Sequence, residues 1–253
     1  MMRYDTLEVT DSGDGIRTVH LNRPDSGNAI NARLVGELSH VVAQCEAADG
    51  PSVLVLTGSA EVFCAGGDFQ AVAVTDAPED PEPLYDLWQR LATGPFISLA
   101  VARGRVNAGG VGLAAACDIL LADSTASFAL PELLFGLFPA CVLPFLTRRV
   151  GAQKAHYLTL TTQPITAAQA LAWGLVDAVE DPVDGLLRKH LLRLRRLTKP
   201  AIGRYKQYRA ETAGGLAEGK TAALTANRAM FSDPQIRADI RRYVTEMKFP
   251  WEG

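Results

Sequence analysis

The chain has 253 residues, of which 48% are hydrophobic and 21% charged, and its formal net charge is −3. This composition is typical of a globular protein with a large apolar core, and the charge argues against general nucleic-acid binding. The sequence shows no signal peptide and no apolar run of the roughly 18 residues that a membrane span needs, so we expect a cytoplasmic protein without membrane contact.

The first half of the sequence alternates between strand and helix patterns. Asn31 stands where a helix N-cap is expected, just before apolar residues at helical spacing. In chain order we expect a strand at 16–22, a helix at 31–47, a strand at 52–58, a short helix from 67, an exposed acidic segment at 75–83, a helix at 83–93 and a strand at 96–102.

The second half begins with "GGVGLAAA", which has room for about two helical turns before "DILLAD" returns as a strand. A short strand and turn follow in "SFALPELLFG", and the chain is mainly helical from Val142 onward. This order predicts an α/β fold, a spiral of ββα units closed by a helical tail. We place the boundary between a catalytic core at 1–195 and a helical region at 196–253.

Two glycine-containing loops carry the strongest chemical signal, "EVFCAGGDF" at 61–69 and "GRVNAGGVGLAAACDI" at 104–119. Each follows a buried strand and opens a helix, where unpaired backbone N–H groups and the positive end of the helix dipole lie. Glycine allows those groups to approach a ligand closely. Two such loops can aim two N–H groups at one oxygen, which is the geometry of an oxyanion hole.

Dinucleotide binding is an alternative for the second loop, because Gly110, Gly112 and Ala115 match the pattern GxGxxA. That motif needs a long helix and an acidic residue about 20 positions further on. The helix here is too short, and Asp123 follows Gly110 after only 13 residues. The cysteines have no paired zinc spacing and the histidines form no HExxH motif, so we expect no metal and no redox cofactor.

Four successive motifs, "NRPDSGNAIN", "FCAGGDF", "GGVGLAAACDILLAD" and "FALPELLFGLFP", resemble those of the crotonase, or enoyl-CoA hydratase, superfamily. The resemblance covers essentially the whole chain. It implies the crotonase spiral of ββα units with a C-terminal helical trimerisation region, and a homotrimer or hexamer. It also implies that the two oxyanion-hole amides belong to Gly67 and Gly109.

The sequence departs from the hydratase pattern at three positions. Family hydratases use two glutamates, and this chain has Gly112 at the first position and Glu132 at the second. Relatives that use CoA often carry lysines where this chain has Glu61 and Gln70, and a lysine would bind a CoA phosphate. Their absence suggests a substrate held on the phosphopantetheine of an acyl carrier protein, although CoA-binding lysines elsewhere are an alternative.

Three longer segments narrow the resemblance: "GRVNAGGVGLAAACDILLAD", "LPELLFGLFPACVLPFLTRRVGAQKAHYLTLTTQPI" and "LLRKHLLRLRRLTKPAIGRYKQY". They resemble the dehydratase of polyketide β-branching cassettes. This implies dehydration of 3-hydroxy-3-methylglutaryl-ACP to 3-methylglutaconyl-ACP, with Glu132 as acid and base. The stretch 188–209, which holds nine Lys or Arg and no acid, would suit an acidic carrier protein.

Further residues are predicted to lie near the substrate. Asp68 is either a helix cap or a polar site residue, and Asn107 either orients the substrate hydroxyl or supports the turn. Tyr85 either reaches the site or covers it, and Cys141 is expected to pack rather than to react. The substrate-binding candidates are Ala65, Asp68, Tyr85, Asn107 and Cys141.

Three other functions remain open from the sequence. The chain could be a hydratase or isomerase of a CoA thioester, or the decarboxylating enzyme of the same cassette. A catalytically inert scaffold that binds acyl carriers is the third, because an acid is missing at Gly112.

Overall fold

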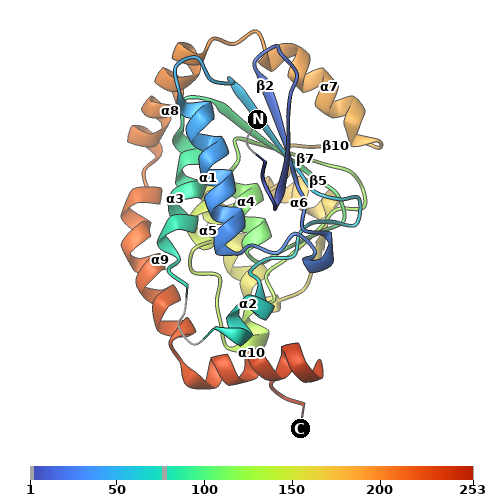
Figure 1. The fold of residues 1–253 in the computed structure, drawn as a ribbon, viewed down its shortest axis with the longest axis vertical. Helices are drawn as coiled ribbons and strands as arrows, with labels where there is room; N and C mark the ends of the chain where they lie inside the picture. The colour runs from blue at the N-terminus through green and yellow to red at the C-terminus, as the bar shows by residue number, and fades with distance from the viewer. Residues whose placement is uncertain (1–2, 76–78, 253) are drawn as a thin grey trace.

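Two β-sheets form the centre of the computed structural model, which describes residues 3–75 and 79–252 (Figure 1). Within these residues the larger sheet has the strand order β1 (Leu7–Asp11), β2 (Ile16–Leu21), β3 (Val53–Thr57), β5 (Ile97–Ala102), β7 (Ile119–Ala122) and β10 (Ala178–Val179). The smaller sheet has the order β4 (Val62–Cys64), β6 (Arg105–Asn107), β8 (Ser127–Ala129) and β9 (Ile165–Thr166). Neighbouring strands are parallel except in the pairs β1–β2 and β8–β9.

The chain passes from the larger sheet to the smaller one and back through helices. Strand pairs β3–β4, β5–β6 and β7–β8 each place their first strand in the larger sheet and their second in the smaller. After each pair come helices, in order α2 (Phe69–Val74) with α3 (Glu82–Thr93), then α4 (Gly109–Ala116), then α5 (Leu143–Thr161). This repetition confirms the predicted α/β spiral of ββα units.

Helix boundaries in the first half follow the capping residues that the sequence indicates. The Asn31 side chain accepts a hydrogen bond from Leu34 N at 3.0 Å and starts α1 (Ala32–Glu46). Asp68 caps α2 in the same way. The short strands β1, β4, β6, β9 and β10 were not anticipated. Of the acidic segment 75–83, residues 76–78 lie outside the described residues.

The remaining helices cover the sheets and extend the core. They are α6 (Ala167–Trp173), α7 (Val183–Leu194), α8 (Lys199–Ala213), α9 (Leu216–Phe231) and α10 (Pro234–Glu246), with 3₁₀ turns at Pro24–Ser26 and Glu132–Phe135. Helices α7 and α8 lie at one end of the molecule and α10 lies beside α2 at the other (Figure 1).

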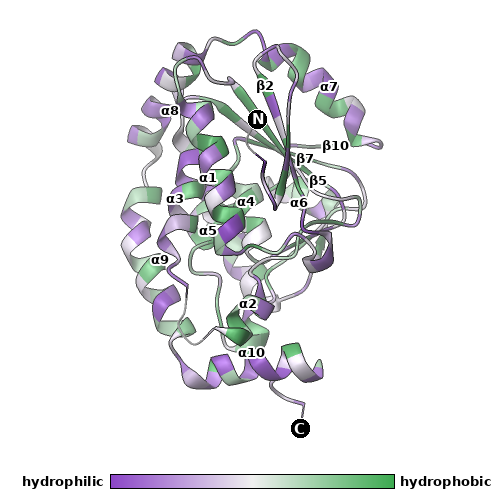
Figure 2. Ribbon diagram, viewed as in Figure 1, coloured by the Kyte–Doolittle hydropathy of each residue, from purple (hydrophilic) through white to green (hydrophobic). Residues whose placement is uncertain are grey.

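The C-terminal helices pack on the rest of the chain. Leu216 and Leu224 of α9 enter the main apolar core, and Ile240 of α10 packs with Phe135 and Leu137. The interior strands β5 and β7 are coloured as hydrophobic in Figure 2, whereas the helices alternate between polar and apolar residues.

The domain boundary at 195/196 and the trimerisation role of the tail stay predictions. No helix in the described ranges has the length and apolarity that a bilayer crossing requires.

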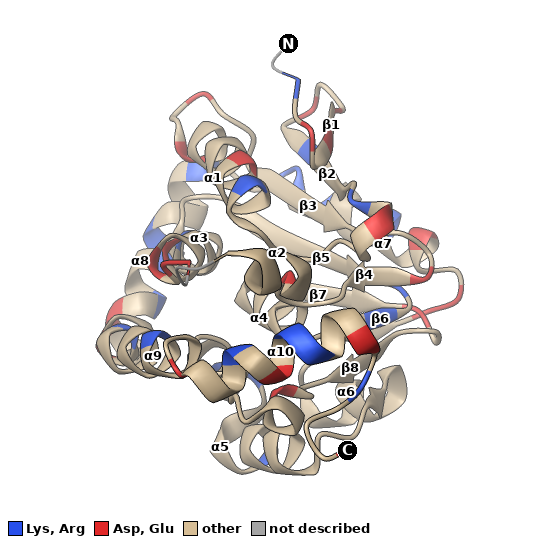
Figure 3. Ribbon diagram, turned by 60° about the horizontal axis from the view of Figure 1, so that its bottom comes forward, with Lys and Arg blue, Asp and Glu red and all other residues tan. Residues whose placement is uncertain are grey.

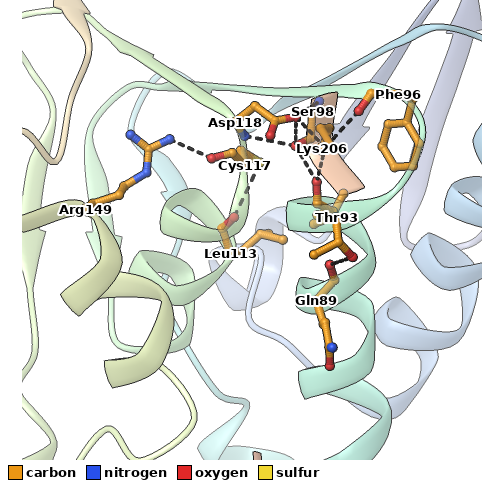
Figure 4. Close-up of polar contacts among 10 residues, drawn as sticks. Gln89, Thr93, Phe96, Ser98, Leu113, Cys117, Asp118, Arg149 and Lys206 are labelled. Carbon is orange, nitrogen blue, oxygen red and sulfur yellow. Dashed lines mark hydrogen bonds and ion pairs between the residues drawn. The ribbon is translucent and has the colours of Figure 1, made fainter. Parts of the chain in front are cut away.

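A buried lysine ties α8 to the sheet (Figure 4). Lys206 Nζ donates to Asp118 Oδ2 at 2.6 Å, and to the carbonyl oxygens of Leu91 at 3.0 Å and Phe96 at 2.9 Å. Asp118 Oδ2 also accepts from the backbone and hydroxyl of Ser98. The side chain of Lys206 is 3% exposed, so removing it leaves the Asp118 carboxylate without its cationic partner and takes a buried donor from the Phe96 carbonyl.

We therefore expect Lys206→Met to lower the free energy of unfolding by about 3 kcal/mol or more, as is usual when one partner of a buried ion pair is lost. The exposed pair of Lys189 with Glu180, at 2.8 Å, provides the control. Lys189→Met should cost less than about 1 kcal/mol. Urea unfolding of both variants measures the difference, and equal losses would show that the Lys206 network contributes no more than a surface pair.

Candidate active site

Three chain segments meet at one edge of the smaller sheet. Strands β4, β6 and β8 are parallel neighbours, so their carboxyl ends point to the same edge. Beyond those ends come the first glycine loop at 65–68, the second at 108–110 and the turn that contains Glu132. The sheet therefore brings together residues that are 65 positions apart in sequence.

The two glycine amides lie side by side. An ideal Cβ on Gly66 would lie 3.5 Å from Gly109 N, and one on Gly109 would lie 3.8 Å from Gly67 N. Gly67 bridges to Ile30 through its neighbours, because Ile30 N donates to Gly66 O and Asp68 N donates to Ile30 O. Neither Gly67 N–H nor Gly109 N–H donates to any residue that the structure describes. Both amides are thus left for a ligand.

The backbone around these amides is unusual. Ala108, directly before Gly109, has φ 49° and ψ −120°, a region that L-residues rarely occupy. Its N–H is held by Ala129 O at 2.9 Å. Gly66 has φ 104°, and a Cβ there would lie 2.7 Å from Ala108 Cβ. Strained backbone of this kind is often found at functional sites, where the surroundings hold it in place.

Glu132 begins the 3₁₀ turn after β8, and its carboxyl group is desolvated. Its Oε2 atom is buried without a hydrogen-bond partner among the described residues. Burial raises the pKa of Glu132 from 4.5 to about 7. A carboxyl group with a pKa near 7 can accept and return a proton at neutral pH.

A cavity of about 1060 Å³ connects these groups. Gly67, Gly109 and Glu132 line it. Four of the predicted substrate-binding residues also line it, namely Ala65, Asp68, Asn107 and Cys141.

Asp68 and Cys141 have structural roles in addition to lining the cavity. Asp68 Oδ1 caps α2 through Ala71 N at 3.0 Å, and Oδ2 pairs with Arg23 at 2.8 Å. Burial raises the pKa of the Cys141 thiol to about 11, so the group is a thiol and not a thiolate at neutral pH. This agrees with the packing interpretation of Cys141.

The structure places Tyr85 away from the cavity. Its side chain is fully buried, and its hydroxyl donates to Leu216 O at 2.7 Å. The ring lies against Phe145, with centroids 5.1 Å apart. Tyr85 therefore joins α3 to α9 in the core and does not line the cavity, contrary to its predicted place among the substrate-binding residues.

Sequence reasoning missed other lining residues. Leu84 and Trp88 project from one face of α3, four residues apart, and α10 contributes Arg237 and Tyr243. The helical spacing of Leu84 and Trp88 is visible in the sequence, but it is equally typical of core residues. No His, Cys, Asp or Glu side chains in the described ranges gather in groups of three or more that could hold a metal ion.

Comparison with known proteins adds a family and a function class. A family model described as enoyl-CoA hydratase/isomerase matches residues 11–253. Bacillaene synthase dehydratase PksH of Bacillus subtilis is 49% identical over all of this chain and 98% of that protein. A crystal structure of the polyketide biosynthesis enoyl-CoA hydratase pksH from the same organism superimposes with a TM-score of 0.94, at 49% identity, covering 98% of this chain and 100% of that one. Enoyl-CoA hydratase echA8 of Mycobacterium tuberculosis is 36% identical, over 74% of this chain and 72% of that protein.

The contact between Gly66 and Ala108 predicts a position-specific loss of stability. Gly66→Ala should lower the free energy of unfolding by about 2 kcal/mol or more, because it combines an unfavourable φ with an overpacked contact. Gly13→Ala is the matched control, because Gly13 has φ 79° with no atom within 4 Å of the added Cβ. Chemical denaturation of the two variants separates the cost of the unfavourable φ, which both share, from the cost of the contact with Ala108. Equal decreases in the free energy of unfolding would rule out a tight contact between the loops.

Glu132→Gln should change the pH dependence of stability. Because the folded-state pKa of Glu132 is about 7 and the ordinary value is 4.5, the charged carboxylate destabilises the fold above pH 7. This loss of stability declines as the pH falls from 7 to 4.5. It disappears below pH 4.5, where Glu132 is protonated in both the folded and the unfolded protein. We expect the variant to be more stable than the parent at pH 8, by up to about 3 kcal/mol, and equal to it at pH 4.

Urea unfolding at both pH values tests this, with Glu211→Gln, an exposed acid on α8, as the control. A Glu132→Gln effect that does not change with pH would show that the carboxyl is not desolvated.

Proposed function

The chain belongs to the enoyl-CoA hydratase/isomerase family of enzymes, and within it we propose a dehydratase that converts 3-hydroxy-3-methylglutaryl-ACP to 3-methylglutaconyl-ACP. The single observation that best supports this type of reaction is the position of the desolvated Glu132 Oε2 in the same cavity as two free backbone amides. The named dehydratase PksH, 49% identical over the full chain, supports the direction of the reaction.

The two amides act on the thioester oxygen. Removal of a proton next to a thioester places negative charge on the carbonyl oxygen. Gly67 N–H and Gly109 N–H donate to that oxygen and stabilise the enolate. Because both donors belong to the backbone, they are in position before the substrate binds.

Glu132 moves the proton. Its carboxylate takes the α-proton, and the carbon–oxygen bond to the 3-hydroxyl group then breaks as the enolate collapses to the alkene. The same proton passes from Glu132 to the departing hydroxyl, so that water leaves and the carboxylate is restored. A single carboxyl group can serve both steps when the two groups leave from one face.

The substrate carrier is proposed from the charges around the cavity. The cationic lining residues in the described part of the chain are Arg105 and Arg237, and Gln70 lines the cavity where a CoA-binding lysine would stand. Arg237 also donates to Thr75 O and so joins α10 to the end of α2. Helix α10 also carries Arg241 and Arg242, beside the acids Asp239 and Glu246, as the blue and red segments of Figure 3 show. We therefore assign docking of an acidic carrier protein to the α10 side.

We do not assign this docking to the basic stretch 188–209. It belongs to α7 and α8, at the opposite end of the molecule from α10 (Figure 1), and none of its residues lines the cavity. Lys199 and Lys206 within it are bound to backbone oxygens. A homotrimer or hexamer stays a prediction.

Dehydration is tested by intact-protein mass spectrometry of the acyl carrier protein. We expect the parent chain to remove one water from 3-hydroxy-3-methylglutaryl-ACP, faster than from the matched CoA thioester. Glu132→Gln should slow the reaction by about 10²- to 10⁴-fold, because it removes the only proposed base. Glu211→Gln on α8 serves as the control and should keep the parent rate.

Three results would contradict parts of the proposal. Full activity of Glu132→Gln would refute its role as base, and faster turnover of the CoA thioester would refute carrier specificity. Loss of carbon dioxide in place of water would identify the decarboxylase alternative.

A further inference from the structure

We propose that Trp88 is a substrate-binding residue, whose indole N–H donates a hydrogen bond to an oxygen of the acyl chain beyond the thioester. This inference rests on the proposed function, because it takes the two glycine amides and Glu132 as already engaged with the reacting carbons. It assigns a donor to the part of the substrate that those three groups do not contact.

The position of Trp88 is set by α3 and by Gly112. Trp88 is 1% exposed and lines the cavity one turn after Leu84. A Cβ on Gly112 would lie 2.4 Å from Trp88 Cη2 and 2.6 Å from Cζ3. The ring edge therefore fills the space that any side chain at 112 would need. Phe145 holds the ring from another side, edge to face, with centroids 5.6 Å apart.

The indole nitrogen is the feature that points to a ligand. Trp88 Nε1 is buried and has no hydrogen-bond partner in the described part of the chain. Indole N–H is a donor only, and a buried donor without an acceptor lowers stability. In a side chain that lines the substrate cavity, a bound acceptor would remove that penalty.

The substrate has two candidate acceptors. After the thioester oxygen and the α-proton are assigned, the acyl chain still presents its 3-hydroxyl group and its terminal carboxylate. Both accept hydrogen bonds, and a carboxylate does so more strongly. Trp88 would hold one of them while Glu132 transfers the proton.

Indole NMR tests the contact without measuring activity. The chain has three tryptophans, so ¹⁵N-tryptophan labelling gives three indole signals. Trp173→Phe and Trp251→Phe assign the Trp88 signal by elimination. Two pantetheine thioesters are then titrated into the Glu132→Gln protein, which lacks the base for turnover. These are 3-methylglutaryl-pantetheine, with a carboxylate only, and 3-hydroxy-3-methylbutyryl-pantetheine, with a hydroxyl only.

A downfield shift of the Trp88 indole proton with either probe supports the inference, and the probe that causes it identifies the acceptor. Calorimetry shows whether each probe binds. If a probe binds and the Trp88 signal does not move with either one, the inference is overturned and the proposed function stands. If neither probe binds, the cavity does not hold acyl thioesters, and both proposals fail.

Trp88→Phe provides the kinetic test, because it keeps an aromatic ring and removes the N–H. We expect kcat/KM for dehydration to fall about 10- to 100-fold, the usual effect of losing a hydrogen bond to a polar or charged group. Trp173→Phe is the matched control: Trp173 lies on α6 against Tyr157, outside the cavity lining, and should keep the parent value. An unchanged kcat/KM in Trp88→Phe would contradict the inference.

Discussion

The parallel pairing of β4, β6 and β8 is the constraint on which the proposed site depends. It places both glycine loops and the Glu132 turn at one edge of the smaller sheet. The loops can then approach only because Gly66 has no Cβ where Ala108 packs. The separation of the two free amides is thus set by backbone contacts, and the chemistry that depends on it needs no adjustable side chain.

Much of this arrangement could be predicted from the sequence, because its signals are local. Asn31 and Asp68 cap helices within their own turn, and apolar spacing identified α1 and β5. The glycine loops and Glu132 stood out as motifs. The strands β4 and β6 could not be identified in the same way, since each has three residues and too short a pattern to separate from a loop.

Tyr85 and Trp88 show where sequence reasoning ends. They lie on the same helix three residues apart, and either could have faced the cavity. Their roles are decided by partners that are distant in sequence: Leu216 accepts from the Tyr85 hydroxyl, and Gly112 leaves room for the Trp88 ring. Lys206 shows the same limit within the basic stretch, because it is buried against Asp118 and charge composition does not reveal burial.

Gly112 and Trp88 depend on each other, because the Trp88 ring occupies the space that a side chain at position 112 would fill. An acid at position 112 would overlap the Trp88 ring, so the first carboxylate of the hydratase pattern is sterically excluded while Trp88 stays in place. What remains is one desolvated carboxyl in the cavity that Trp88 and the two glycines also line, and neither Glu132 Oε2 nor Trp88 Nε1 has a hydrogen-bond partner among the described residues. A fold keeps such unpaired groups at a cost in stability, and that cost is expected where a ligand completes the hydrogen bonds.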